Sequence, residues 1–162
     1  MVNDADLRHL RRAVDLAAEA LEKGDEPFGS VLVGADGTVL FEDHNHVAGG
    51  DSTRHPEFAI ARWAAEHLPA SERATATVYT SGEHCPMCSA AHAWVGLGRI
   101  VYASSSEQLG SWVAEWGLPA GPVRALSVNE VAPGIATAGP VGMFTEEIRA
   151  LHARLHGRGT GD

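Results

Sequence analysis

Two short apolar runs, ATVYTS (76–81) and RIVYAS (99–104), restrict most strongly how this chain can fold. Each has the length and the β-branched and aromatic content of a buried strand. Between them, the segment that begins at Pro86 has a helical pattern. Strands that alternate with helices in this way form βαβ crossovers, and the resulting sheet is covered by helices on both faces. The sequence therefore predicts an α/β domain.

The remaining segments fit the same layered arrangement. Apolar residues recur at helical spacing from Asp4 to Lys23, with Asn3 or Asp4 as the cap. The segment FGSVLVGADGTVLFEDHN (28–45) predicts a β-hairpin with Asp-Gly at its turn. Further helices are expected from Pro56 to Leu68, from Glu107 to Trp116 and from Val141 to His156, and a further strand from Val123 to Val128. We therefore expect one three-layer α/β/α domain over residues 1–162, with a mixed sheet of about five strands.

Composition restricts the partners of this domain. Twelve Lys and Arg residues against 21 Asp and Glu residues give a net charge of −9, which repels phosphate backbones unless a local basic patch overrides it. The densest basic stretches, RHLRR (8–12) and HARLHGR (152–158), are typical of solvated helix faces. The chain shows no apolar run of membrane-spanning length and no signal-peptide core. We expect a cytoplasmic protein with neither a membrane nor a nucleic-acid partner.

Both cysteines lie three positions apart in TSGEHCPMC (80–88), where a predicted strand is followed by a helix. The unsatisfied N–H groups at a helix start favour thiolates there. Taken alone, this spacing also fits two small core residues or a redox-active dithiol. However, HPE (55–57), at the start of the preceding helix, adds an imidazole and a carboxylate in a similar strand-to-helix position. The combination favours a metal site.

One histidine and two cysteines provide three zinc ligands, and a fourth position left for water is typical of catalytic rather than structural zinc. The order H-x-E and then C-x-x-C also matches the signature of zinc-dependent nucleobase deaminases. We therefore predict one Zn²⁺ per chain, bound by His55, Cys85 and Cys88. Glu57 is the predicted acid/base group, which carries protons from the attacking water to the ring and to the departing amine. Its alternative role is an interaction with the helix dipole.

Five segments carry a resemblance to a known family: PFGSVLV (27–33), Asn45, HPE (55–57), TSGEHCPMC (80–88) and RIVYA (99–103). On these residues the chain resembles the cytidine deaminase-like superfamily, and within it the branch of bacterial guanine deaminases and tRNA adenosine deaminases. The resemblance implies a five-stranded sheet between helices, one zinc ion per chain and a homodimer or larger assembly. Two positions depart from the family pattern: Pro56 replaces the usual Ala, and His84 replaces the usual Pro.

The resemblance also implies residues that contact the substrate. Asn45 would hydrogen-bond the ring, although an Asn at a strand end is also a common turn former. Phe28 is similar to a position that packs against the substrate at the pocket entrance, and would otherwise be a core aromatic residue. His84 either fills space or faces the pocket and selects the substrate through a hydrogen bond. Trp112 and Trp116, four positions apart, are candidates for a lid or for ordinary packing.

Three classes of function remain. The first, which we favour, is a zinc hydrolase that deaminates a small aminated heterocycle. The second is a tRNA-editing deaminase, against which the acidic charge argues. The third is a catalytically silent interaction module, against which the intact zinc and acid/base residues argue. Within the first class, a free nucleobase or nucleoside is expected, with guanine or a related aminopurine favoured and cytosine, cytidine or a triazine-type ring as alternatives.

Overall fold

A mixed sheet with the strand order β2-β1-β3-β4-β5 forms the centre of the structure, a computed structural model that describes residues 1–158. Its strands are β1 (Gly29–Val33), β2 (Val39–His44), β3 (Thr77–Gly82), β4 (Ile100–Ser104) and β5 (Thr137–Ala138). Strand β1 runs antiparallel to both β2 and β3, whereas β3, β4 and β5 run parallel to one another. The predicted hairpin, the predicted crossover and the predicted number of strands are therefore confirmed.

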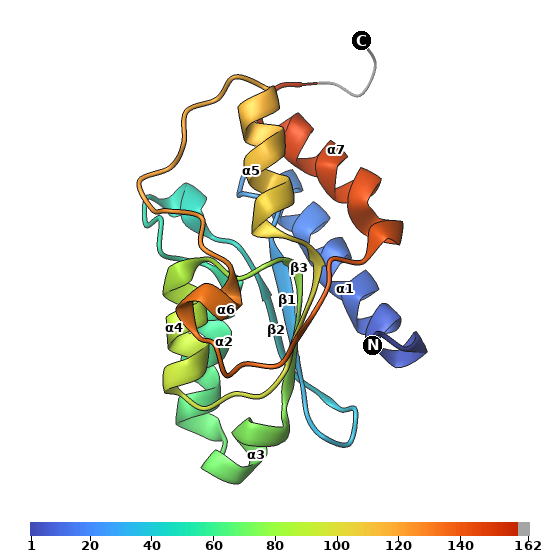
Figure 1. Cartoon of the computed structure of the whole chain (residues 1–162), viewed down its shortest axis with the longest axis vertical. Coiled ribbons are helices and arrows are strands. Elements are labelled where there is room, and N and C mark those ends of the chain that lie inside the picture. The colour runs from blue at the N-terminus through green and yellow to red at the C-terminus, as the bar shows by residue number, and fades with distance from the viewer. Residues whose placement is uncertain (159–162) are drawn as a thin grey trace.

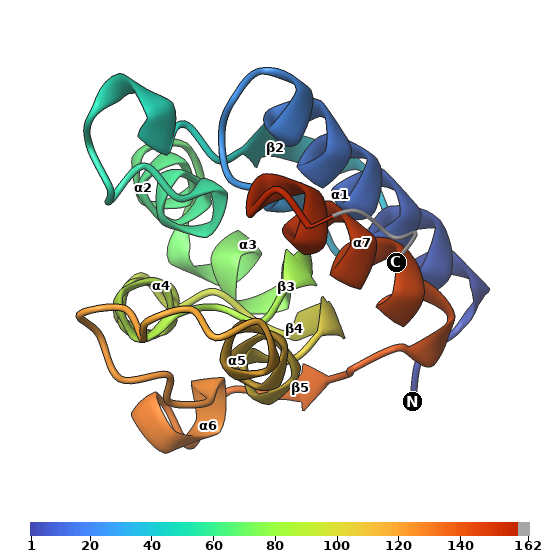
Figure 2. The ribbon, with the colours of Figure 1, turned by 90° about the horizontal axis from the view of Figure 1, so that it is seen from above.

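Helices cover both faces of this sheet, as Figures 1 and 2 show. They are α1 (Asp4–Glu22), α2 (Pro56–His67), α3 (Ala70–Thr75), α4 (Pro86–Trp94), α5 (Ser106–Glu115), α6 (Val128–Val131) and α7 (Thr145–Leu155). Helix α1 begins with a capping box, in which Asn3 and Asp6 each bond the other's backbone N–H at 2.9 Å. The three-layer prediction is confirmed. Within residues 1–158, no helix is both long enough and apolar enough to cross a membrane.

Side-chain alternation along the buried strands divides the core in two. Val31 and Tyr79 contribute to the cluster beneath α1, which also includes residues of α5 and α7. Leu32 and Val78 point the other way, toward α2 and α4. Gly29 allows α1 to approach β1 closely, because a Cβ at this position would lie 2.3 Å from the carbonyl oxygen of Ala13. The first helix and the first strand therefore have a fixed spacing.

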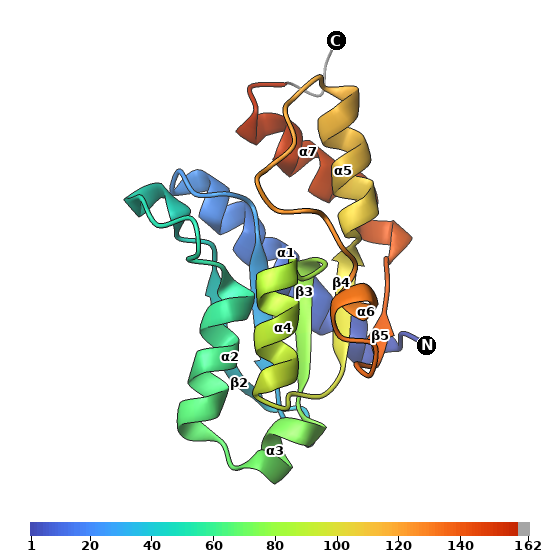
Figure 3. The same cartoon turned by 60° about the vertical axis from the view of Figure 1, so that its left-hand side comes forward.

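The predicted strand from Val123 to Val128 is wrong. This stretch belongs to an irregular segment that leads from α5 to α6, and Figure 3 shows it descending between these two helices. Glycine and proline are frequent in GLPAGP (117–122), which disfavours regular structure, and the side chain of Val123 is 61% exposed. The fifth strand is instead the two-residue β5. The last helix also begins later than predicted, because residues 142–144 form a 3₁₀ turn.

Candidate active site

The amino ends of α2 and α4 bring three sulfur and nitrogen groups together. His55 is the N-cap residue of α2, Cys85 is the N-cap residue of α4, and Cys88 lies in the first turn of α4. Pro56 and Pro86 each begin their helix, where the missing N–H of proline costs nothing. Figure 3 shows the two helices next to each other on the same face of the sheet. The cluster thus depends on two local helix-start signals.

The spacing of these groups fits a zinc ion. The Nδ1 atom of His55 lies 3.5 Å from the Sγ atom of Cys85 and 3.6 Å from that of Cys88. Tetrahedral zinc with its usual Zn–S and Zn–N bond lengths separates a sulfur and a nitrogen ligand by about 3.6 Å. All three ligand atoms lie within 4.8 Å of one another. The predicted ligands His55, Cys85 and Cys88 therefore form a candidate zinc site.

Protonation of the cluster also suits a divalent cation. A hydrogen bond from Cys88, together with one from His55, lowers the pKa of the Cys85 thiol to about 4. The hydrogen bond between His55 and Cys85 raises the pKa of His55 to about 9. The hydrogen bond between Cys88 and Cys85, together with burial, raises the pKa of Cys88. Thus the cluster holds one thiolate next to two protonated groups. A bound metal would displace both protons, as metal ligation by thiolate and neutral imidazole requires.

Glu57 lies beside this cluster in a buried position, with 5% of its surface exposed. The hydroxyl groups of Thr80 and Ser30 lie 3.0 and 3.3 Å from its Oε1 atom, and 2.8 Å from each other. Burial raises the pKa of this carboxyl, against the charge of His55, which lowers it. A buried carboxylate in one fixed orientation, next to a metal site, is suited to proton transfer.

A cavity of about 590 Å³ opens onto these groups. Phe28, His55, Glu57 and Cys85 line one side of it. The opposite side is formed by α5 and by the irregular segment, through Leu109, Val113, Leu118, Val123 and Arg124. The ring of Phe28 is held edge-on by His152 of α7, with ring centroids 5.1 Å apart. The cavity therefore has a polar zinc side and a largely apolar wall.

Glu83 fixes both ends of that apolar wall. One of its carboxylate oxygens accepts the backbone N–H of Ser106 at 3.0 Å, and the other accepts that of Val128 at 2.9 Å. Ser106 is the first residue of α5 and Val128 is the first residue of α6. A carboxylate at two helix starts is favourable for both helix dipoles. Because Glu83 lies two residues before Cys85, it joins the wall to the zinc side.

Asn45 and His84, which were expected to contact the substrate, do not line the cavity, and Trp112 takes the packing role among its two predicted alternatives. Asn45 is 1% exposed, and its Oδ1 atom accepts the N–H groups of Glu26 and Val47, as expected of a turn former. His84 is fully buried, with its ring edge-on to His92 at 5.4 Å between centroids. Trp112 belongs to the core below α1. None of the three lines the cavity in the described part of the chain.

Sequence reasoning missed Ser30, Thr80 and Glu83. Two of them had a visible signal, because Ser30 and Thr80 are polar residues inside otherwise apolar strands, and a buried hydroxyl requires a partner. Their partner becomes apparent only when β1 pairs with β3, which places Ser30 directly opposite Thr80. Glu83 gave no signal, because its two partners, Ser106 and Val128, lie far from it in the sequence, and Val128 falls in the stretch wrongly predicted as a strand.

Comparisons with known proteins agree with this geometry. A probable cytosine deaminase from Schizosaccharomyces pombe is 33% identical over 108 residues, which cover 67% of this chain and 65% of the relative. A guanine deaminase from Bacillus subtilis is 39% identical over 97 residues, which cover 59% of this chain and 62% of the relative. The chain thus spans slightly less than two thirds of these relatives. tRNA adenosine deaminases also occur among the similar proteins.

The similarity in fold and the family model both point to deaminases, as the sequence relatives do. A solved structure of guanine deaminase from Bacillus subtilis superimposes with a TM-score of 0.59 at 29% identity, covering 82% of this chain and 91% of that structure. Residues 3–104 match the family model described as the cytidine and deoxycytidylate deaminase zinc-binding region. This range contains all three candidate zinc ligands and Glu57. The chain therefore belongs to the zinc-binding cytidine and deoxycytidylate deaminase family.

Proposed function

We propose that this protein is a zinc-dependent hydrolytic deaminase of a free nucleobase or nucleoside, a hydrolase of C–N bonds in cyclic amidines. Guanine or a related aminopurine is the favoured substrate. The observation that carries the proposal is the buried carboxylate of Glu57, which lines the same cavity as His55 and Cys85. The hydroxyls of Ser30 and Thr80 contact this carboxylate.

The residues of the cavity have distinct parts in this reaction. His55, Cys85 and Cys88 would hold a zinc ion, which would supply a water of lowered pKa whose oxygen replaces the amino group of the ring as ammonia leaves. Glu57 carries the two protons of that water in turn, one to the ring nitrogen and one to the departing amine. Ser30 and Thr80 keep the carboxylate in place through Oε1. Burial raises the pKa of Glu57, so its carboxyl group takes up a proton more readily than an exposed one would.

The cavity supports a small planar substrate. Its volume of about 590 Å³ is within the range of small-molecule sites. The apolar side chains of Leu109, Val113 and Leu118 provide surfaces for a ring. Arg124 is the only Lys or Arg side chain that lines the cavity in the described chain, and the whole chain carries a charge of −9. A tRNA substrate would need several basic contacts to its backbone, so we place tRNA below free bases and nucleosides.

Cytosine or cytidine is the second candidate, supported by the similarity to the probable cytosine deaminase of Schizosaccharomyces pombe. The zinc-loaded protein should be incubated with guanine, 2,6-diaminopurine, cytosine, cytidine, a triazine and a tRNA anticodon stem-loop, and ammonia release measured. We expect release from at least one free base or nucleoside. Release from the stem-loop alone, or none at full zinc occupancy, would contradict the proposal.

Glu57→Gln is the matched control for this assay. The substitution keeps the shape of the side chain and the contact of Oε1 with Thr80, but removes the carboxylate that accepts the proton. We expect turnover to fall by about 10² to 10⁴ with zinc content unchanged. Turnover close to wild type would assign proton transfer to another group. We also infer a homodimer from the family resemblance, and light scattering of the chain that gives the monomer mass would contradict it.

A further inference from the structure

A second group of metal-binding side chains lies outside the candidate active site. Asp25 follows the end of α1, and His44 and His46 lie at and just after the end of β2. One ligand atom from each of the three residues lies within 4.8 Å of the others. Asp25 and His44 are buried, whereas His46 is half exposed. The two histidine rings face each other, with centroids 4.5 Å apart.

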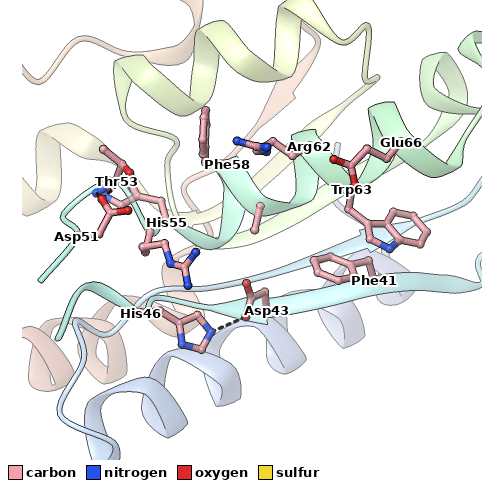
Figure 4. Close-up of a pocket in the computed structure, with 12 residues that line it drawn as sticks. Phe41, Asp43, His46, Asp51, Thr53, His55, Phe58, Arg62, Trp63 and Glu66 are labelled. Carbon is pink, nitrogen blue, oxygen red and sulfur yellow. Dashed lines mark hydrogen bonds and ion pairs between the residues drawn. The ribbon is translucent and has the colours of Figure 1, made fainter. Parts of the chain in front are cut away.

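Hydrogen bonds fix which ring nitrogen is free on each histidine. The Nδ1 atom of His44 is 2.8 Å from the carbonyl oxygen of Asn45, so Nδ1 carries the proton and Nε2 keeps its lone pair. The Nε2 atom of His46 is 2.8 Å from Oδ1 of Asp43, so Nε2 donates and the lone pair is left on Nδ1. A dashed line marks this contact in Figure 4. Metal-binding histidines usually donate their other N–H to a carbonyl or a carboxylate in this way.

Asp25 and Lys23 complete the surroundings. One oxygen of Asp25 accepts the backbone N–H of Ala48 at 2.9 Å, which orients the carboxylate and leaves its second oxygen for a ligand. The ammonium of Lys23 lies 3.2 Å from Nε2 of His44, so a positive charge already contacts the lone pair that a metal would use. Lys23 is exposed at the end of α1 and can turn away into solvent.

We propose that Asp25, His44 and His46 form a second site for a divalent transition-metal ion, separate from the site of His55, Cys85 and Cys88. Two imidazoles and a carboxylate suit Zn²⁺ and related ions, and they bind less tightly than a site with two thiolates. A bound ion would join the connection after α1 to the end of β2. The proposal of a second site is independent of the proposed deaminase activity, because a measurement of bound metal is enough to test it.

The test counts zinc on the purified chain of 162 residues. After dialysis against Zn²⁺, elemental analysis is expected to give two equivalents per chain, and mild chelation is expected to leave the one held by the cysteine site. His46→Ala, at a half-exposed position, is expected to remove the second equivalent only. His67→Ala is the matched control, because His67 is also exposed and bonds a carbonyl through Nδ1 but lies outside the cluster.

Lys23→Ala provides the sharper measurement. Because the lysine competes for Nε2 of His44, its removal is expected to lower the Kd of the second zinc in calorimetry about three- to tenfold, the equivalent of one hydrogen bond. One equivalent in the wild type, full second binding in His46→Ala, or an unchanged Kd in Lys23→Ala would each overturn the proposal. An equal loss in His67→Ala would indicate nonspecific binding to surface histidines and would overturn it as well.

Discussion

Removing the Glu83 carboxylate should loosen both ends of the pocket wall at once. The two hydrogen bonds to the N–H groups of Ser106 and Val128 have a charged acceptor, and such bonds contribute about 1.5 to 3 kcal/mol each. Glu83 is partly exposed, so the lower value applies, and Glu83→Ala should lower the free energy of unfolding by about 3 kcal/mol. For a chain of this size that corresponds to a fall in Tm of about 6 to 12 °C. Glu83→Gln keeps one acceptor oxygen and should cost about half as much.

Hydrogen exchange distinguishes this linkage from ordinary helix capping. Glu130 accepts the N–H of Ser127 at 2.7 Å and caps α6 alone, so Glu130→Ala should increase exchange only around α6. Glu83→Ala should increase it at the starts of α5 and α6 together. If the proposed substrate binds in the cavity, the same substitution should raise KM more than it lowers kcat, because the wall would contact that substrate. Faster exchange at only one of the two helices, or a Tm no lower than that of Glu130→Ala, would refute the linkage.

Other substitutions test the site and the fold. Cys88→Ser should lose zinc in elemental analysis and lower Tm, and full retention of zinc would remove Cys88 from the ligand set. Asn45→Asp keeps the acceptor atom of the turn, and Asn45 does not line the cavity, so the substitution should leave kcat/KM and Tm unchanged; a kcat/KM lower by about tenfold would mean that the amide donor binds the ring. Burial raises the pKa of Asp6, but hydrogen bonds from Arg99, Asn3 and Tyr79 outweigh it and lower the pKa overall. The stability that Asp6 contributes is therefore present above its unfolded pKa of 3.8 and lost as pH falls below it, so urea denaturation from pH 6 to pH 3 should show a smaller loss of stability in Asp6→Asn than in wild type.

The sequence predicted the zinc side of the site well because each part of it depends on local signals. Pro56 and Pro86 mark helix starts, so the ligands beside them could be placed without knowledge of the tertiary structure. The wall opposite could not be placed in the same way. Val123 and its neighbours resemble a strand in their apolar content, but they face a cavity, and no local pattern distinguishes these two environments. His84 illustrates the same limit, because its neighbours in the sequence do not show that its ring is buried against His92 of α4.

The separation of the zinc ligands along the chain affects how well the protein resists proteolysis in the cell. In an unfolded chain the two cysteines can still chelate zinc, but His55 lies far away in sequence, and bringing it to them costs loop-closure entropy. Zinc therefore binds the native state more tightly, and mass action adds about 4 kcal/mol of stability when free zinc exceeds the Kd a thousandfold. The supply of metal would then determine how much of the protein survives proteolysis, as well as how much of it is active.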